Sequence, residues 1–275
     1  MTRPVILSRA DGEGPPADGT GVVHRRGILR CAQDDRWAFV IAALLLLSMT
    51  VHAQDALVVG ASADRLDSGD GGGVSLLWIH PRAGNTLTAG AAFFTLAGTR
   101  WTYATLGGTL RAGARTTFNA EASLGRGDDD AGDFRYLLVR GGVTRELLPR
   151  RLYGEGEWLQ ADVARRQNGI ARIGATYLPL PLLTLRGSLY QSIAGDDDTT
   201  LVTVRGDYDL GRAIAIAGVS AGRATPVLLQ QGGGGETRVR EAFAGISMRG
   251  WTIVATVGED RQRLSVSWRI PMGAR

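Results

Sequence analysis

Histidine is the side chain of this sequence best suited to acid–base chemistry, because imidazole gains and loses a proton near neutral pH. The chain contains three, and two of them, His24 and His52, lie in a segment that we expect to be removed as a leader. The third, His80, stands at the end of an expected strand, beside a turn. A hydrolase needs its base within hydrogen-bond reach of a nucleophile. We interpret His80 as a solvated turn residue and predict no catalytic residue.

Two acidic runs are the next candidates for chemistry, since hard divalent cations take carboxylate oxygens as ligands. They are Asp128 to Asp130 and Asp196 to Asp198. Each could bridge a cation to a neighbouring phosphate, but neither has the spacing or the closing glutamate of an EF-hand loop. Aspartate is also common in turns. We interpret both runs as solvated turn residues and predict no metal site and no cofactor.

The elements that must position these residues are strands. The last of them, Arg263 to Ile270, alternates strictly between apolar and polar side chains, which is the period of a strand with one apolar and one polar face. Most segments from Leu57 onward repeat this pattern, and nothing resembles a helix that could cover a sheet. The expected strands are 56–64, 72–80, 86–96, 100–110, 114–125, 133–145, 151–162, 168–178, 183–193, 199–209, 212–222, 238–248, 251–258 and 262–270.

This pattern predicts an all-β fold, a closed antiparallel up-and-down transmembrane β-barrel of about 14 strands. Hydrophobic residues make up 44% of the chain, which suits strands that are apolar on one face only. A soluble β-sandwich or a secreted adhesin is an alternative fold. A soluble sheet, however, needs charged residues on the face where this chain offers Leu, Val, Ala and Trp.

The connections between the expected strands alternate in length, as in outer-membrane barrels with long external loops and tight periplasmic turns. The even-numbered connections are short, and an even number of strands places both termini in the periplasm. The third and thirteenth connections, around Gly98 and Glu259, are short exceptions, and a bend at either one would reduce the count to 12 strands. The long odd-numbered connections are 64–72, 125–133, 163–169, 195–199 and 224–237.

The N-terminal part of the chain reads as a leader. An apolar run from Trp37 to Leu47 has the length of a signal-peptide core, Arg36 flanks it, and Ala53 suits cleavage. We therefore predict a signal peptide over 36–53 and a mature barrel over 54–275, with an uncleaved membrane anchor as the alternative. Residues 1–35 fit no element and read as an unstructured extension or a start site placed too far upstream.

Other features exclude function classes. The only cysteine, Cys31, lies before the expected mature chain, so disulfide and thiol chemistry are excluded there. All 31 basic residues are Arg, and acidic residues interrupt them, so no basic stripe indicates nucleic-acid binding. The run Gly232 to Gly235 lacks the Lys-Ser/Thr of a phosphate-binding loop and reads as a linker. Beside it, the apolar patch Pro226 to Leu229 either constricts the lumen or rests on the rim.

Strand alternation also assigns side chains to the two faces of the barrel wall. Inward charges can pair across strands and brace the wall, or they can line a water-filled path. Outward aromatic rings at the periplasmic strand ends suit the membrane interface. The lumen-lining candidates are Glu121, Arg140, Glu155, Glu157, Arg172, Arg186, Arg205 and Asp207. The interface aromatics are Trp78, Tyr177, Tyr208, Trp251 and Trp268.

Two stretches carry a family resemblance, Gly60 to Leu66 before a glycine-rich loop and Leu148 to Glu157 at the middle turn. With the closely spaced hairpins up to Trp268, they make residues 55–270 resemble the YaiO-like outer-membrane β-barrel family. That family has no well-established activity. The resemblance therefore implies a barrel in the cell outer membrane and assigns no catalytic residue.

These observations predict a non-enzymatic outer-membrane barrel. We expect either a passive small-solute channel or an accessory to envelope or exopolysaccharide export. The expected partners are outer-membrane lipid, lipopolysaccharide and the barrel assembly machinery, with a polysaccharide or a small solute as cargo. The alternative is an outer-membrane enzyme acting on lipid or peptide. Such an enzyme needs its base near the outer leaflet, whereas His80 falls at the periplasmic end of its strand.

Overall fold

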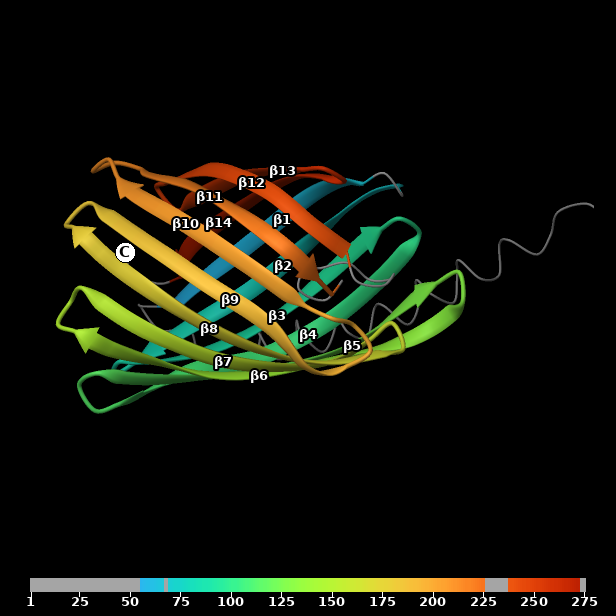
Figure 1. The fold of residues 1–275 in the computed structure, drawn as a ribbon, viewed down its shortest axis with the longest axis horizontal. Helices are drawn as coiled ribbons and strands as arrows, with labels where there is room; N and C mark the ends of the chain where they lie inside the picture. Colours follow the sequence, from blue (N-terminus) through green and yellow to red (C-terminus); the bar gives the residue numbers. More distant parts are fainter. Residues whose placement is uncertain (1–54, 67–68, 226–236, 273–275) are drawn as a thin grey trace, which may run out of the picture. The chain divides into compact units, whose positions relative to one another are not determined.

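The computed structural model describes residues 55–66, 69–225 and 237–272. Within these ranges the chain forms a closed barrel in which every strand pairs antiparallel with its sequence neighbours and β1 pairs with β14 (Figure 1). The strands are β1 (Asp55–Leu66), β2 (Gly69–Arg82), β3 (Asn85–Leu96), β4 (Thr99–Ala112), β5 (Thr116–Asp129), β6 (Gly132–Leu148), β7 (Leu152–Val163), β8 (Arg166–Leu180), β9 (Leu183–Gly195), β10 (Thr200–Asp209), β11 (Ile214–Ala224), β12 (Thr237–Met248), β13 (Trp251–Gly258) and β14 (Arg261–Met272).

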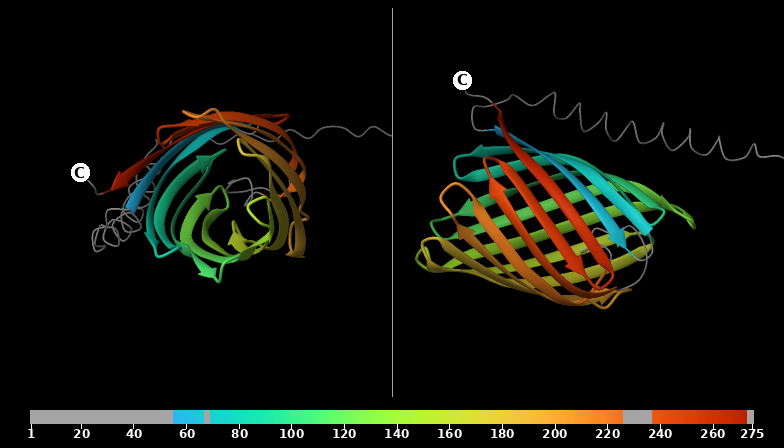
Figure 2. Two further views of the ribbon diagram at one scale, coloured as in Figure 1. Left: turned by 90° about the vertical axis from the view of Figure 1, so that its left-hand side faces the viewer. Right: turned by 90° about the horizontal axis from the view of Figure 1, so that it is seen from above.

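The predicted fold class is confirmed, with 14 strands in the part of the chain that the structure describes. The connections β3–β4 and β13–β14 are tight turns between separate strands rather than bends, so the alternative of 12 strands is wrong. Figure 2 shows the strands winding obliquely around the barrel axis, as closure of a sheet requires. No helix among the described residues is long and apolar enough to cross a membrane.

The predicted contrast between long and short connections is only partly correct. Three expected loops, 64–72, 125–133 and 163–169, are mostly strand, and β5 stays paired with β6 as far as Asp129 and Gly132. Acidic and glycine residues therefore do not end these strands. The two strands of a hairpin are held together by backbone hydrogen bonds, which form whether the side chains are polar or apolar. We call the end that holds the odd-numbered turns, from β1–β2 to β13–β14, the odd-turn end, and the opposite one the even-turn end.

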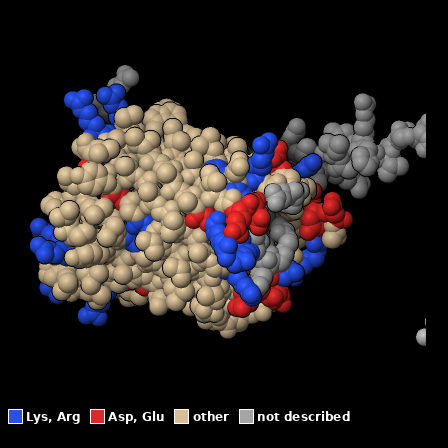
Figure 3. Space-filling view, turned by 45° about the horizontal axis from the view of Figure 1, so that its top comes forward, with Lys and Arg blue, Asp and Glu red and all other residues tan. Residues whose placement is uncertain are grey.

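The outer face of the barrel is apolar. Leu106, Leu124, Ile173 and Val219 point outward on four different strands, and each is more than half exposed. Figure 3 shows a broad wall of uncharged side chains with charged residues gathered toward its ends. Such a surface requires lipid, because soluble proteins rarely expose apolar patches of this size.

Two buried charges hold the closing seam of the barrel. The Arg261 guanidinium of β14 donates to Asp64 Oδ1 of β1 through Nη2 at 2.8 Å and through Nε at 3.1 Å. Both side chains are nearly inaccessible, at 7% and 5% exposure. Arg263 Nε lies 3.6 Å from the same carboxylate oxygen, and Glu241 Oε1 lies 4.0 Å from Arg261 Nη1. The first and last strands are therefore joined by an ion pair as well as by their backbone ladder.

Arg261→Leu tests this seam. The substitution leaves the Asp64 carboxylate buried without its double donor, so we expect the free energy of unfolding to fall by about 3 kcal/mol. Urea titration of the detergent-folded barrel measures the change. The matched control is Arg240→Leu, which removes a pair with Glu259 whose side chains are 54% and 52% exposed, and it should cost below about 1 kcal/mol. Equal losses in the two variants would contradict the role of the seam.

Candidate functional site

The inner wall carries a row of alternating charges across four adjacent strands, which we call the ion-pair ladder. Arg140 Nη2 of β6 donates to Glu121 Oε2 of β5 at 2.8 Å, and Arg140 Nη1 lies 3.9 Å from Glu157 Oε1 of β7. Arg172 of β8 donates to Glu157 Oε2 at 3.3 Å and to Glu155 Oε2 at 2.7 Å. Glu121 and Arg140 face each other directly in the strand register, as do Glu157 and Arg172. The ladder therefore braces four neighbouring strands.

A second charged group lies on β9 and β10. Arg186 and Arg205 are directly opposed in the register, which places like charges side by side. Asp207 offsets the repulsion, because its carboxylate accepts from Arg205 Nε at 2.7 Å and lies 3.6 Å from Arg186 Nη2. The Arg186 side chain is half exposed, at 52%. Of these three residues, Arg186 offers the most accessible charge to the lumen.

The structure pairs each of the eight lumen-lining candidates with an opposite charge. Four of them, Glu121, Arg140, Glu157 and Arg172, line a cavity. The sequence reading missed the seam charges Asp64, Glu241, Arg261 and Arg263. The predicted connection 64–72 places Asp64 at the edge of a loop. Arg263, however, falls on the polar face of the last expected strand, and this alternation was the available signal.

An array of four aromatic rings lies on the inner face of β3, β4 and β6, and we call it the aromatic column. Phe94 stacks on Trp101 with ring centroids 5.5 Å apart and on Tyr103 at 6.2 Å. Tyr103 stacks on Tyr136 at 4.6 Å with an interplanar angle of 6°. The two tyrosines belong to β4 and β6, and they meet across β5 because Gly125 lies between them in the register.

The ladder and the column share one cavity of about 540 Å³. Its wall includes three tyrosines, Tyr103, Tyr136 and Tyr190, together with four of the five ladder residues. Tyr190 of β9 extends the aromatic surface past the ladder, and the Arg172 guanidinium carbon lies 5.7 Å from its ring centroid. The cavity thus presents aromatic faces, hydroxyl groups and paired charges together.

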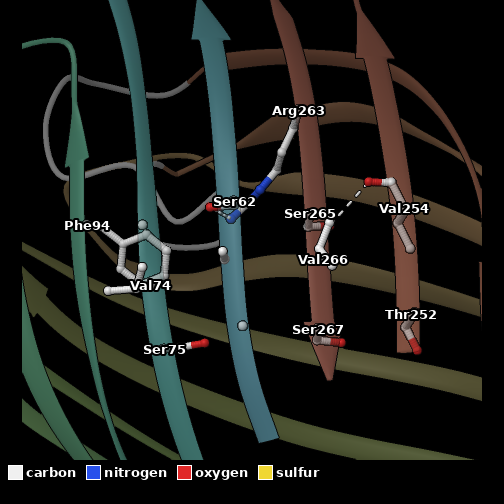
Figure 4. A pocket seen from close by; sticks show the side chains of 13 residues that line it. Ser62, Val74, Ser75, Phe94, Thr252, Val254, Arg263, Ser265, Val266 and Ser267 are labelled. Atoms are coloured by element: carbon white, nitrogen blue, oxygen red, sulfur yellow. Dashed lines mark hydrogen bonds between the residues drawn. The ribbon is translucent and has the colours of Figure 1, made fainter. Parts of the chain in front are cut away.

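A second hollow of about 290 Å³ follows the closing seam on β1, β2, β13 and β14, and we call it the hydroxyl strip (Figure 4). Arg263 Nη2 reaches Ser62 Oγ at 3.4 Å, and Ser265 Oγ donates to the Val254 carbonyl at 3.3 Å. Ser75 lines both this hollow and the larger cavity, so the two lie side by side on the inner wall. The hydroxyl side chains of the strip are Ser62, Ser75, Thr252, Ser265 and Ser267.

Four of the five expected interface aromatics are exposed on the outer face near the even-turn end. Tyr177 and Tyr208 are each 44% exposed, while Trp251 and Trp268 are 46% and 40% exposed. The two tryptophans are directly paired across β13 and β14, and their rings stack at 5.0 Å. The even-turn end of these strands therefore carries the predicted aromatic residues.

The fifth expected interface aromatic, Trp78, is buried at 4% exposure, so the expectation that it lies open to lipid is not met. Its indole Nε1 donates to Asp55 Oδ2 at 3.2 Å, and its ring stacks on His80 at 5.3 Å. His80 Nδ1 lies 2.7 Å from Asp55 Oδ1. The interpretation of His80 as a solvated turn residue is wrong, because a buried carboxylate and an aromatic ring hold the imidazole against the start of β1.

The acidic run at 196–198 is also not simply solvated. Asp197 is buried, its Oδ2 accepts from Asn168 Nδ2 and its N–H donates to Asn168 Oδ1, both at 2.9 Å. Thr225 N donates to Thr199 Oγ1 at 3.1 Å, so this connection also contacts the residue after β11. The connection 196–199 is therefore not a solvated loop tip, because hydrogen bonds join it to Asn168 and Thr225 at the odd-turn end.

The other acidic run contributes a clamp at the odd-turn end, beyond the apolar outer face. Arg165 Nη1 donates to both carboxylate oxygens of Asp129, at 2.9 Å and 3.1 Å. This hydrogen bonding holds the pKa of the Asp129 carboxyl below its ordinary value. Among the described residues, no group of three or more His, Cys, Asp or Glu side chains is placed to hold a metal ion. The expected leader with His24, Cys31 and His52, and the loop features at 226–229 and 232–235, lie outside the described residues.

Gly125→Ala tests the packing of the aromatic column. A β-carbon at Gly125 would lie 1.9 Å from the Thr102 carbonyl oxygen and 2.7 Å from Tyr103 Cβ. We expect a loss of about 2 kcal/mol in unfolding free energy and a weaker near-ultraviolet circular dichroism signal from the tyrosine stack. Gly187→Ala is the control, because its β-carbon would meet nothing within 4 Å. A Gly125→Ala barrel as stable as the control, with an unchanged spectrum, would refute the packing argument.

No protein-family model matches this chain, and no curated protein matches it in sequence. Solved structures are similar to it in fold. The deltaS2S3 mutant of the TodX monoaromatic hydrocarbon channel has a TM-score of 0.60 and 10% identity, over 80% of this chain and 91% of that one. The outer membrane protein Omp33 of Acinetobacter baumannii has a TM-score of 0.51 and 9% identity, over 80% of this chain and all of that one. The closed barrel, its apolar outer face and these likenesses agree on an outer-membrane β-barrel.

Proposed function

We propose that this protein is a passive channel for small polar solutes across the outer membrane. The observation that carries the proposal is the arrangement of the inner charges. Each ladder residue is paired with a neighbour along the wall, so the charges line a cavity of about 540 Å³ instead of closing it. A 14-stranded wall is also wider than the eight-stranded barrels whose side chains fill the interior.

The proposal includes an orientation and a maturation step. We place the odd-turn end outside the cell and both ends of the barrel chain, at β1 and β14, on the periplasmic side. The signal peptide over 36–53, release of 54–275 and membership of the YaiO-like family are parts of this proposal. In this orientation His80 lies at the periplasmic end of β2, away from outer-leaflet lipid, so we propose no catalysis there.

The direct test is reconstitution of residues 54–275 in planar lipid bilayers, after a heat-modifiable band has shown that the barrel is folded in detergent. We expect stable single-channel steps. A folded barrel without conductance would overturn the channel and favour a structural role or an accessory role in envelope or exopolysaccharide export. If the protein isolated from the outer membrane still carries residues 36–53, the proposed maturation is refuted, and the channel proposal is not affected.

Arg186→Gln should shift ion selectivity. Asp207 keeps the closer pair with Arg205 at 2.7 Å, so the substitution removes an accessible positive charge without leaving a buried charge alone. A unit charge about 7 Å from a permeating ion in water is worth about 0.6 kcal/mol. Loss of the charge favours potassium and disfavours chloride by about 2.7-fold each, so we expect the potassium-to-chloride permeability ratio, measured by reversal potentials, to rise about sevenfold. Arg212→Gln is the control, because it makes the same charge change in the exposed β10–β11 turn. Equal changes in the permeability ratio of the two variants would show that Arg186 does not set ion selectivity from the lumen wall.

A further inference from the structure

We infer that the wall formed by the ion-pair ladder, Tyr103, Tyr136 and Tyr190 binds a neutral carbohydrate of one or two sugar rings. This inference rests on the proposed channel function and names the class of solute. A cavity of about 540 Å³ lies within the range of about 300–1,000 Å³ that is usual for small-molecule sites. The choice among solutes then depends on the chemistry of its wall.

The tyrosines supply the first half of that chemistry. A pyranose ring has a face of C–H groups that packs on an aromatic ring, while its hydroxyl groups need donors and acceptors around the edge. Tyr103 and Tyr190 are both partly exposed on the wall of the cavity, one on each side of the ladder. Phe94 and Tyr136 stack on Tyr103, so this ring offers its edge and its hydroxyl group. Arg172 lies over one face of Tyr190, so Tyr190 offers its second face and its hydroxyl group beside the paired charges.

The ion-pair ladder supplies hydrogen-bond donors and acceptors for the sugar hydroxyl groups, and these groups discriminate between solutes. A guanidinium has five N–H donors, and a carboxylate accepts at both oxygens. Arg172 donates through Nη1 to Glu157 and through Nη2 to Glu155, and each of these two nitrogens has a second N–H group. A sugar hydroxyl can accept from an arginine and donate to a glutamate together, so it can bind without separating any pair.

Other solute classes fit this wall less well. A small anion or cation would compete with a partner that each ladder charge already has. A hydrocarbon would remove water from the charged groups without offering hydrogen bonds in exchange, which is costly. The hydroxyl strip continues the surface from Ser75 along the closing seam with small hydroxyl side chains. A polyhydroxylated solute can therefore exchange hydrogen bonds along the wall as it moves.

The test uses the full chain expressed in a Gram-negative host and extracted from the outer membrane. Maltose is the probe, and sorbitol is the comparison because it has hydroxyl groups but no ring face. We expect maltose to interrupt single-channel current and to bind the folded barrel in titration calorimetry, with sorbitol about tenfold weaker in both measurements. Equal effects of the two polyols would overturn the role of the aromatic faces.

Variants locate the site. Tyr190→Leu and Tyr103→Leu should each weaken maltose binding about tenfold, whereas Tyr190→Phe keeps the ring and should stay within about threefold of the original. Tyr208→Leu is the matched control, because Tyr208 is exposed on the outer face. A tenfold loss in Tyr208→Leu, or none in either lumen variant, would overturn the assignment. Tyr190→Phe guards against a fold defect in Tyr190→Leu.

The outcomes separate this inference from the channel proposal. A conducting barrel that neither binds maltose nor is interrupted by it would overturn the carbohydrate site and leave the channel standing. A barrel that binds maltose without conducting would overturn the channel and leave the site standing. Stronger interruption of current by sodium benzoate than by maltose would overturn the preference for a neutral solute.

Discussion

The pairing of β1 with β14 is the constraint on which the rest of this structure depends. A bilayer core offers no water to unpaired backbone groups, so a sheet within it is stable only when its two edges meet. Here the edges join along the full length of both strands, from Asp55 opposite Met272 to Leu66 opposite Arg261. Because the sheet closes, every strand has one face toward lipid and the other toward an enclosed space.

Closure of the barrel gives its outer and inner faces different chemical requirements. The outer face needs only apolar bulk, which Leu, Ile, Val and aromatic side chains supply. The inner face has to satisfy charges and rings in a confined space. It does so by pairing charges along the wall and by placing glycine opposite large rings, as at Gly73 opposite Phe94 and Gly127 opposite Phe134. Because charges pair along the wall and rings lie over glycines, the side chains stay close to the wall and leave a cavity beside them.

Alternation along the sequence is sufficient to predict the strands and their number. It is insufficient wherever a contact joins strands that are not sequence neighbours. Asp64 and Arg261 are 197 residues apart, and their pairing follows only from closure of the barrel. Tyr103 and Tyr136 meet because a glycine on the intervening strand leaves room for both rings. Alternation assigns faces and not partners, so it also misses the Asp55 carboxylate that holds His80 from the neighbouring strand β1 and the Asn168 amide that holds Asp197 from β8.

The joining of β1 to β14 also determines when the fold can be completed. The residues that close the barrel belong to the first and the last strands of the chain, so the last hydrogen bonds cannot form before the C-terminal segment has been synthesised. Until then, any partly assembled sheet has two open edges, which readily pair with other chains. Closure between the two ends of a chain is also the slowest kind of contact to form, because it joins the residues furthest apart in sequence. A chain shortened by even its final strand should therefore remain an aggregation-prone intermediate in place of a smaller barrel.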